Sequence, residues 1–242
     1  MRLKSLLEAE QFEEIANIIV AFMGLFLSMI GFAVLMAFSA MTRQWEPILA
    51  CAVYGTTLVL LFVSSMLYHI ALATDYLHKK AFEIVDHCAI YLLIAGSFTP
   101  FALLVIKGST GLWMLGLLWL VAGLGCLHKI LWPVGSDWIS VLAYVSMGWS
   151  VVPVYKPLMA GLQAGGTALV VAGGLFYTFG SLFYIFDHKF KLAHALWHGF
   201  VIGGSLSLYL AILFFVVMPG TEADALKQPS AAFSNAEGLN QP

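Results

Sequence analysis

The sequence predicts an all-α membrane protein, a bundle of seven transmembrane helices with its N-terminus in the cytoplasm and its C-terminus outside. Three observations carry this prediction: apolar residues make up 61% of the 242 residues, charged residues make up only 10%, and the apolar residues form long stretches. A soluble domain carries roughly 25% charged residues, which cover its surface. Most of the folded surface must therefore face hydrocarbon.

Seven stretches are long enough to cross a bilayer as a helix, which takes about 20 mostly apolar residues. They are residues 15–40, 48–73, 82–106, 112–131, 138–155, 169–186 and 192–218. The boundary between the fifth and sixth stretches is the least defined, because two prolines and the glycine-rich run 161–166 lie there. A transmembrane β-barrel would show shorter segments of alternating hydrophobicity instead.

The two ends of the chain differ from these stretches. Residues 1–14 are predicted to form an N-terminal cytoplasmic or interfacial segment, either a short amphipathic helix or a solvated tail. We expect the first span to be retained rather than cleaved as a signal peptide, because its apolar core is long and acidic residues precede it. Residues 15–218 are predicted to form the seven-helix membrane domain. The composition of residues 219–242 predicts a disordered C-terminal tail.

Basic residues predict the orientation in the membrane. The side that holds the N-terminus and the loops after the second, fourth and sixth spans carries seven Lys and Arg residues, and the opposite side carries four. Because Lys and Arg accumulate in cytoplasmic loops, we expect the N-terminus in the cytoplasm. The formal net charge of −2 leaves no basic surface for a nucleic acid partner.

A few polar residues lie inside the predicted spans, where a charge at the centre costs about 2.5 to 3.5 kcal/mol. His69 lies near the end of the second span, Asp86 near the start of the third, and His194 and His198 near the start of the seventh. The second span runs toward the cytoplasm and the other two run away from it, so these residues share one membrane depth. His194 and His198 are four residues apart and face the same way, as do Ser65 and His69.

These residue types are typical of a metal site. Three imidazoles and an open fourth position form a catalytic type of zinc site, and zinc suits this ligand set better than magnesium, manganese or iron. The run from His194 to His198 lacks the glutamate of the metalloprotease helix, so a carboxylate must come from elsewhere. Asp86 is available, either as a ligand through the bound water or as its general base. The alternative is a histidine pair that only hydrogen-bonds to neighbouring helices.

Several motifs occur in order along residues 12–218. They are Glu14-x-x-Asn17, Ser65-x-x-x-His69, the run from Asp86 to Phe101, Met147-Gly148-Trp149, the run from Gly173 to Thr178, and His194-x-x-x-His198. Together they resemble the hemolysin III family, within the wider group of progestin and adipoQ receptors and alkaline ceramidases. One departure is Val20-Ala21, where family members often carry Thr-His, so no histidine role is carried over to that place.

The resemblance implies a seven-helix protein that binds Zn²⁺ through His69, His194 and His198, with Asp86 and Ser65 near the water on the metal. We expect a multi-pass protein of the bacterial cytoplasmic membrane, with membrane lipids as partners. Three functions stay open. The first is a zinc-dependent hydrolase of lipid amides or esters, linked to membrane lipid homeostasis, in which Asp86 moves the proton and Ser65 orients the water or the oxyanion. The second is a non-enzymatic sensor or receptor-like protein with structural zinc, and the third is a pore-forming hemolysin. The sequence ranks the hydrolase slightly above the sensor.

Overall fold

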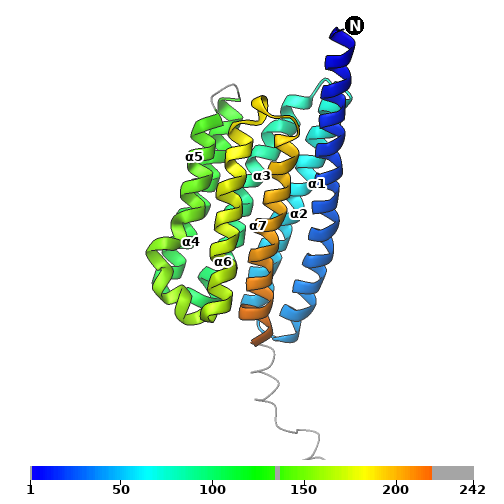
Figure 1. Ribbon diagram of the computed structural model, residues 1–242. Coiled ribbons are helices and arrows are strands. Elements are labelled where there is room, and N and C mark those ends of the chain that lie inside the picture. The colour runs from blue at the N-terminus through cyan, green and yellow to red at the C-terminus, as the bar shows by residue number, and fades with distance from the viewer. Residues whose placement is uncertain (1, 134–136, 220–242) are drawn as a thin grey trace, which may run out of the picture.

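The structure, a computed structural model, describes residues 2–133 and 137–219, and its regular elements in these ranges are helical. The elements are α1 (Arg2–Met41), α2 (Trp45–Ala73), α3 (Lys79–Pro100), π-helical η1 (Phe101–Ile106), α4 (Gly108–Leu131), α5 (Asp137–Gly148), the 3₁₀ helix η2 (Trp149–Val154), α6 (Tyr155–Ile185), the 3₁₀ turn η3 (Asp187–Lys189), α7 (Ala193–Ile212) and π-helical η4 (Leu213–Val217). The long helices run side by side, with the N-terminus at one end of the bundle and the end of α7 at the other (Figure 1). The predicted tail lies outside the described residues, apart from residue 219.

Within the described residues, six helices are long and apolar enough to cross a membrane. They are Gln11–Met41, Trp45–Ala73, Lys79–Ile106, Gly108–Leu131, Trp138–Ile185 and Ala193–Val217. The predicted helical membrane fold is therefore confirmed. The predicted fifth and sixth spans coincide with the single segment Trp138–Ile185, so helix length and composition identify six spans and do not confirm the predicted seven. The side of the membrane on which each terminus lies stays a prediction.

The segment Trp138–Ile185 nevertheless contains two helices, α5 and α6, which lie side by side in Figure 1. By their standard rises, α5 and η2 together extend about 30 Å, the thickness of the hydrocarbon core. The chain then continues in helical geometry and is broken only at Gln163, whose φ is 58° and ψ is 178°. The connection between α5 and α6 is helical and largely apolar rather than a polar loop. For this reason helix length and hydropathy identify the two helices as one segment.

The first helix also includes the residues that precede the predicted first span, for which the sequence left a helix and a tail open. Residues 3–14 continue the first span as one helix, α1, which extends beyond its neighbours at the N-terminal end (Figure 1). Residues 2–14 contain no Gly or Pro and are rich in Leu and Glu, which are strong helix formers. The expected boundary between residues 14 and 15 is therefore not a break in the backbone.

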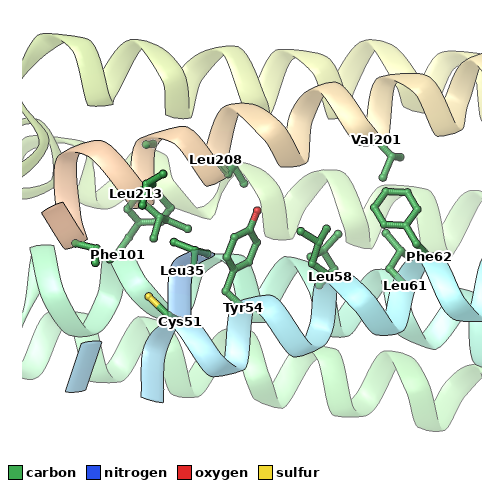
Figure 2. Close-up of a cluster of buried hydrophobic side chains, with 14 of the residues drawn as sticks. Leu35, Cys51, Tyr54, Leu58, Leu61, Phe62, Phe101, Val201, Leu208 and Leu213 are labelled. Carbon is green, nitrogen blue, oxygen red and sulfur yellow. The ribbon is translucent and has the colours of Figure 1, made fainter. Parts of the chain in front are cut away.

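The buried core ties together the helices that carry the candidate site. Tyr54 of α2 is fully buried, and in Figure 2 its hydroxyl points away from α2 toward the helix that carries Leu208. This hydroxyl donates a hydrogen bond to the backbone carbonyl of Ser205 on α7 at 3.0 Å. The Ser205 hydroxyl in turn lies 2.8 Å from the hydroxyl of Tyr177 on α6. Helices α2, α6 and α7 are thus linked inside an apolar cluster where water does not compete for the hydrogen bonds.

Glycines allow α1 and α2 to pack closely. A Cβ atom at Gly24 of α1 would lie 2.3 Å from the ring of Phe62 on α2, and one at Gly55 of α2 would lie 2.0 Å from the ring of Phe32 on α1. Carbon atoms do not approach each other so closely without a bond, so each glycine makes room for a ring of the opposite helix. These contacts fix the position of α1 against α2.

Replacing Gly55 tests this packing. We expect Gly55→Ala to lower the stability of the bundle by about 1 to 3 kcal/mol, because the new methyl group collides with Phe32. Gly116→Ala on α4 is the matched control: no atom lies within 4 Å of its added Cβ, and it should be neutral or slightly stabilising. Thermal unfolding in detergent, followed by tryptophan fluorescence, measures both. A Gly55→Ala midpoint at or above that of wild type would contradict this account of the packing.

Candidate metal centre

Helices α2 and α7 bring three histidines together at the end of the bundle that also carries the N-terminus. His69 lies in the last turns of α2, whereas His194 and His198 lie in the first turns of α7. One ligand nitrogen from each histidine lies within 4.8 Å of those of the other two. The three residues that the sequence placed at one depth therefore meet in space.

The three imidazole rings lie edge to face. Their centroids are 4.8 to 5.1 Å apart, and the angles between their planes are 69° to 89°. The Nε2 atoms of His69 and His198 are 3.0 Å apart. Around a tetrahedral metal with bonds of about 2.0–2.1 Å, neighbouring nitrogen atoms lie about 3.3 Å apart. The spacing of this pair fits a metal ion, and it also fits a hydrogen bond between two neutral imidazoles.

Burial differs among the three histidines. His69 and His198 are only 2% and 5% exposed, whereas the side chain of His194 is 22% exposed. Buried imidazole nitrogens cost free energy unless they find partners. The cluster therefore has a closed side toward the bundle and a more open side at His194.

Helix α3 places Asp86 beside the cluster. Asp86 is buried, and the hydroxyl of Ser64 on α2 donates a hydrogen bond to its Oδ1 at 3.4 Å. Asp86 does not belong to the group of three converging ligands, but it lines the same cavity as Ser65 and His198. This position suits a carboxylate that acts through a water molecule. The sequence did not identify Ser64 as its partner.

Ser65 contacts a different histidine from the one that its spacing indicated. The sequence placed Ser65 and His69 on one face of α2, and both are buried there. The Ser65 hydroxyl lies 3.5 Å from Nε2 of His198 on α7. Ser65 therefore lies against the inner nitrogen of a candidate ligand, at the wall of the cavity.

Two carboxylates contact the outer nitrogens of the histidines. Glu14 Oε2 of α1 lies 2.8 Å from His69 Nδ1, and Asp187 Oδ2 of η3 lies 3.3 Å from His194 Nδ1. Sequence reasoning missed both partners. For Glu14 a signal existed in the motif Glu14-x-x-Asn17, because residues three apart share a helix face and Asn17 is buried.

Two tyrosines hold the start of α3 in place. His87, next to Asp86, lies with its Nε2 3.1 Å from the hydroxyl of Tyr184 on α6. The Tyr144 hydroxyl of α5 donates a hydrogen bond to the His87 carbonyl at 3.0 Å. These contacts join α3 to α5 and α6 directly beside Asp86.

A cavity of about 310 Å³ leads from the polar residues into the apolar interior. Ser65, Asp86 and His198 lie on its wall, and most of its other lining side chains are apolar. The lining residues of α3 and η1 extend from Asp86 to Phe101, which corresponds to about 22 Å along a helix. Lining residues of η2 and α6 such as Val152 and Val171 are exposed, so the cavity reaches the outer surface on that side.

Comparison with known proteins identifies the family. The model of the family described as "Haemolysin-III related" matches residues 10–209, a range that includes all the residues above. The hemolysin-3 homolog of Bacillus subtilis (strain 168) is 38% identical over 208 residues, which cover 85% of this chain and 95% of that protein. Hemolysin-3 of Bacillus cereus is 37% identical over 205 residues, which cover 85% of this chain and 92% of that protein. The monocyte to macrophage differentiation factor of Homo sapiens is 29% identical over 181 residues, 74% of each chain. The resemblance that the motifs indicated is confirmed, and the chain belongs to the haemolysin-III related family.

Proposed function

We propose that this protein is a zinc-dependent hydrolase of lipid amides or esters that acts within a bacterial cytoplasmic membrane and contributes to lipid homeostasis. One observation carries the proposal: the three-histidine cluster meets a long and mostly apolar cavity at His198, and Asp86 and Ser65 line the same cavity. A catalytic metal site keeps one position open, whereas a structural site fills it with a fourth protein ligand. Among the described residues, the converging group has three members.

Zinc suits these donors best. Imidazole nitrogens are common zinc ligands, whereas magnesium and calcium prefer oxygen ligands. His69, His194 and His198 would hold the ion through their convergent nitrogens. When bound, zinc supplies a Lewis acid that polarises a carbonyl group and lowers the pKa of water toward about 7.

In this proposal, Asp86 moves the proton. In the hydrolysis, the water oxygen forms a bond to the carbonyl carbon, and the Asp86 carboxylate accepts the proton that the water loses. The bond from that carbon to the leaving nitrogen or oxygen then breaks, and Asp86 returns the proton to the leaving atom. The hydrogen bond from Ser64 to Asp86 Oδ1 orients the carboxylate for both transfers.

In this proposal, Ser65 stabilises negative charge. Its hydroxyl lies at the cavity wall, 3.5 Å from His198 Nε2. From there it can donate a hydrogen bond to the carbonyl oxygen as that oxygen gains charge. In a cavity that excludes water, one such donor typically contributes about 10²- to 10³-fold to the rate.

The cavity indicates the substrate class. Apolar lining favours a hydrocarbon chain, and the length of the cavity, about 22 Å along α3 and the start of η1, favours an extended chain over a compact ligand. The polar groups at the site would then bind the amide or ester carbonyl at one end of that chain. Exposed lining residues on η2 and α6 support entry of the substrate from the bilayer.

Metal analysis tests the ligand set. We expect wild type purified in detergent to contain about one zinc ion per chain, and His194→Ala or His198→Ala to contain far less, because two imidazoles bind zinc too weakly. His78→Ala removes an exposed histidine just before α3 and should retain the metal. Mass spectrometry of the metal content measures all four proteins. An equal, near-zero zinc content in wild type and variants would contradict the metal centre.

Replacing Asp86 separates catalytic from structural zinc. We expect Asp86→Asn to retain zinc but to hydrolyse ceramide-like or phospholipid substrates about 10²- to 10⁴-fold more slowly, because the proton acceptor is lost. Glu83→Gln is the control, since it removes another acid of α3 that pairs with Lys80. Product release in mixed micelles is followed by mass spectrometry. Zinc-loaded wild type that hydrolyses none of these lipids would contradict the hydrolase and favour a sensor, and leakage of vesicles would favour a pore.

A further inference from the structure

We propose that Glu14 is a positioning residue for the metal centre: its carboxylate holds the His69 imidazole in the tautomer and orientation that turn Nε2 toward the metal. This role rests on the metal-binding part of the proposed function and does not require hydrolysis. It assigns to α1, which supplies none of the three candidate ligands, a direct part in the site.

The two ring nitrogens of His69 have different partners. Nδ1 lies 2.8 Å from Glu14 Oε2, which is the usual length of a charge-assisted hydrogen bond. Nε2 lies 3.0 Å from His198 Nε2 and therefore faces the cluster. An ionised carboxylate can only accept a hydrogen bond, so the contact with Glu14 places the proton on Nδ1. Nε2 then keeps its lone pair for the metal.

The orientation of α1 turns Glu14 toward the bundle. Phe12 and Ile15 are 61% and 53% exposed, whereas Asn17 and Ala21 are buried on the other side of the helix. Glu14, three residues before Asn17, lies on the side that faces α2, and its side chain is 24% exposed. An ionised carboxylate at the edge of a membrane span is costly without a partner. His69 is the partner that the structure provides.

The second carboxylate contact is weaker. Asp187 lies 3.3 Å from His194 Nδ1, and the two side chains are 39% and 22% exposed. The Glu14–His69 contact is shorter, and His69 is almost fully buried. Solvent screens a buried hydrogen bond less than an exposed one. We therefore expect Glu14 to contribute more to metal affinity than Asp187.

The expected effect is on metal affinity. Carboxylates that hold the outer nitrogen of a ligating histidine fix the ring and make the ligand more basic, and their loss typically lowers affinity about 10- to 100-fold. Without Glu14, the His69 ring is free to turn and to place its proton on either nitrogen. Selecting the correct orientation and tautomer of the His69 ring would then make the free energy of zinc binding less favourable.

Zinc titration of the full-length protein tests this role. After the metal is removed with a chelator, zinc binding is measured in competition with a coloured chelator, and cobalt absorption reports the ligand geometry. We expect Glu14→Ala to bind zinc about 10- to 100-fold more weakly and to change the cobalt spectrum. Glu14→Gln should fall between, because its amide oxygen still accepts the Nδ1 proton without the charge. Glu13→Gln, which removes an equal charge one residue earlier, should match wild type.

The outcomes separate this role from the proposed hydrolysis. Equal zinc affinity and equal cobalt spectra for Glu14→Ala and Glu13→Gln would overturn the positioning role. So would a Glu14→Ala protein that loses thermal stability but keeps its zinc affinity, since the contact would then only hold α1 and α2 together. Wild type that binds no zinc would overturn both this role and the metal centre. Weaker zinc binding by Glu14→Ala, in a protein that hydrolyses no lipid, would support the positioning role and contradict the hydrolase.

Discussion

Hydrocarbon offers no hydrogen-bond partner, and this constraint shapes both the bundle and its site. The backbone satisfies it by forming long helices, from α1 to α7. Polar side chains satisfy it by contacting one another: His69 lies against His198, and Asp86 accepts a hydrogen bond from Ser64. The buried histidines and Asp86 lie at one end of the bundle, whereas buried hydroxyl groups such as that of Ser205 lie deeper along the spans.

The site depends on the packing of distant parts of the helices. The histidines lie near the ends of α2 and α7, and the separation of these helices is set deeper in the bundle, where Tyr54 bonds to Ser205. Glycine–phenylalanine contacts fix α1 against α2, and this packing allows Glu14 to reach His69. A change in the apolar core is therefore expected to alter the spacing of the candidate ligands.

Much of the fold and most of the candidate site could be predicted from the sequence. Hydropathy predicted the membrane helices, and the direction of each span predicted that His69 and His194 lie at the same membrane depth. The division between the fifth and sixth predicted spans, near Gln163, was less predictable, because the connection between them is helical and lacks a polar loop. The contact of Glu14 with His69 was not predictable, because the motif spacing puts Glu14 and Asn17 on one helix face but does not say which neighbouring side chain that face meets. Asp187 lies in the turn η3, whose geometry no periodic pattern specifies.

The central claim is that a metal ion is bound by three imidazoles contributed by α2 and α7. The function proposed from the cavity, the family and the contacts of Asp86 depends on that ion. Zinc K-edge X-ray absorption of the purified protein tests it most directly. We expect nitrogen and oxygen ligands at about 2.0–2.1 Å with the scattering pattern of three imidazoles. A sulfur shell at about 2.3 Å, or a shell without imidazole scattering, would contradict it.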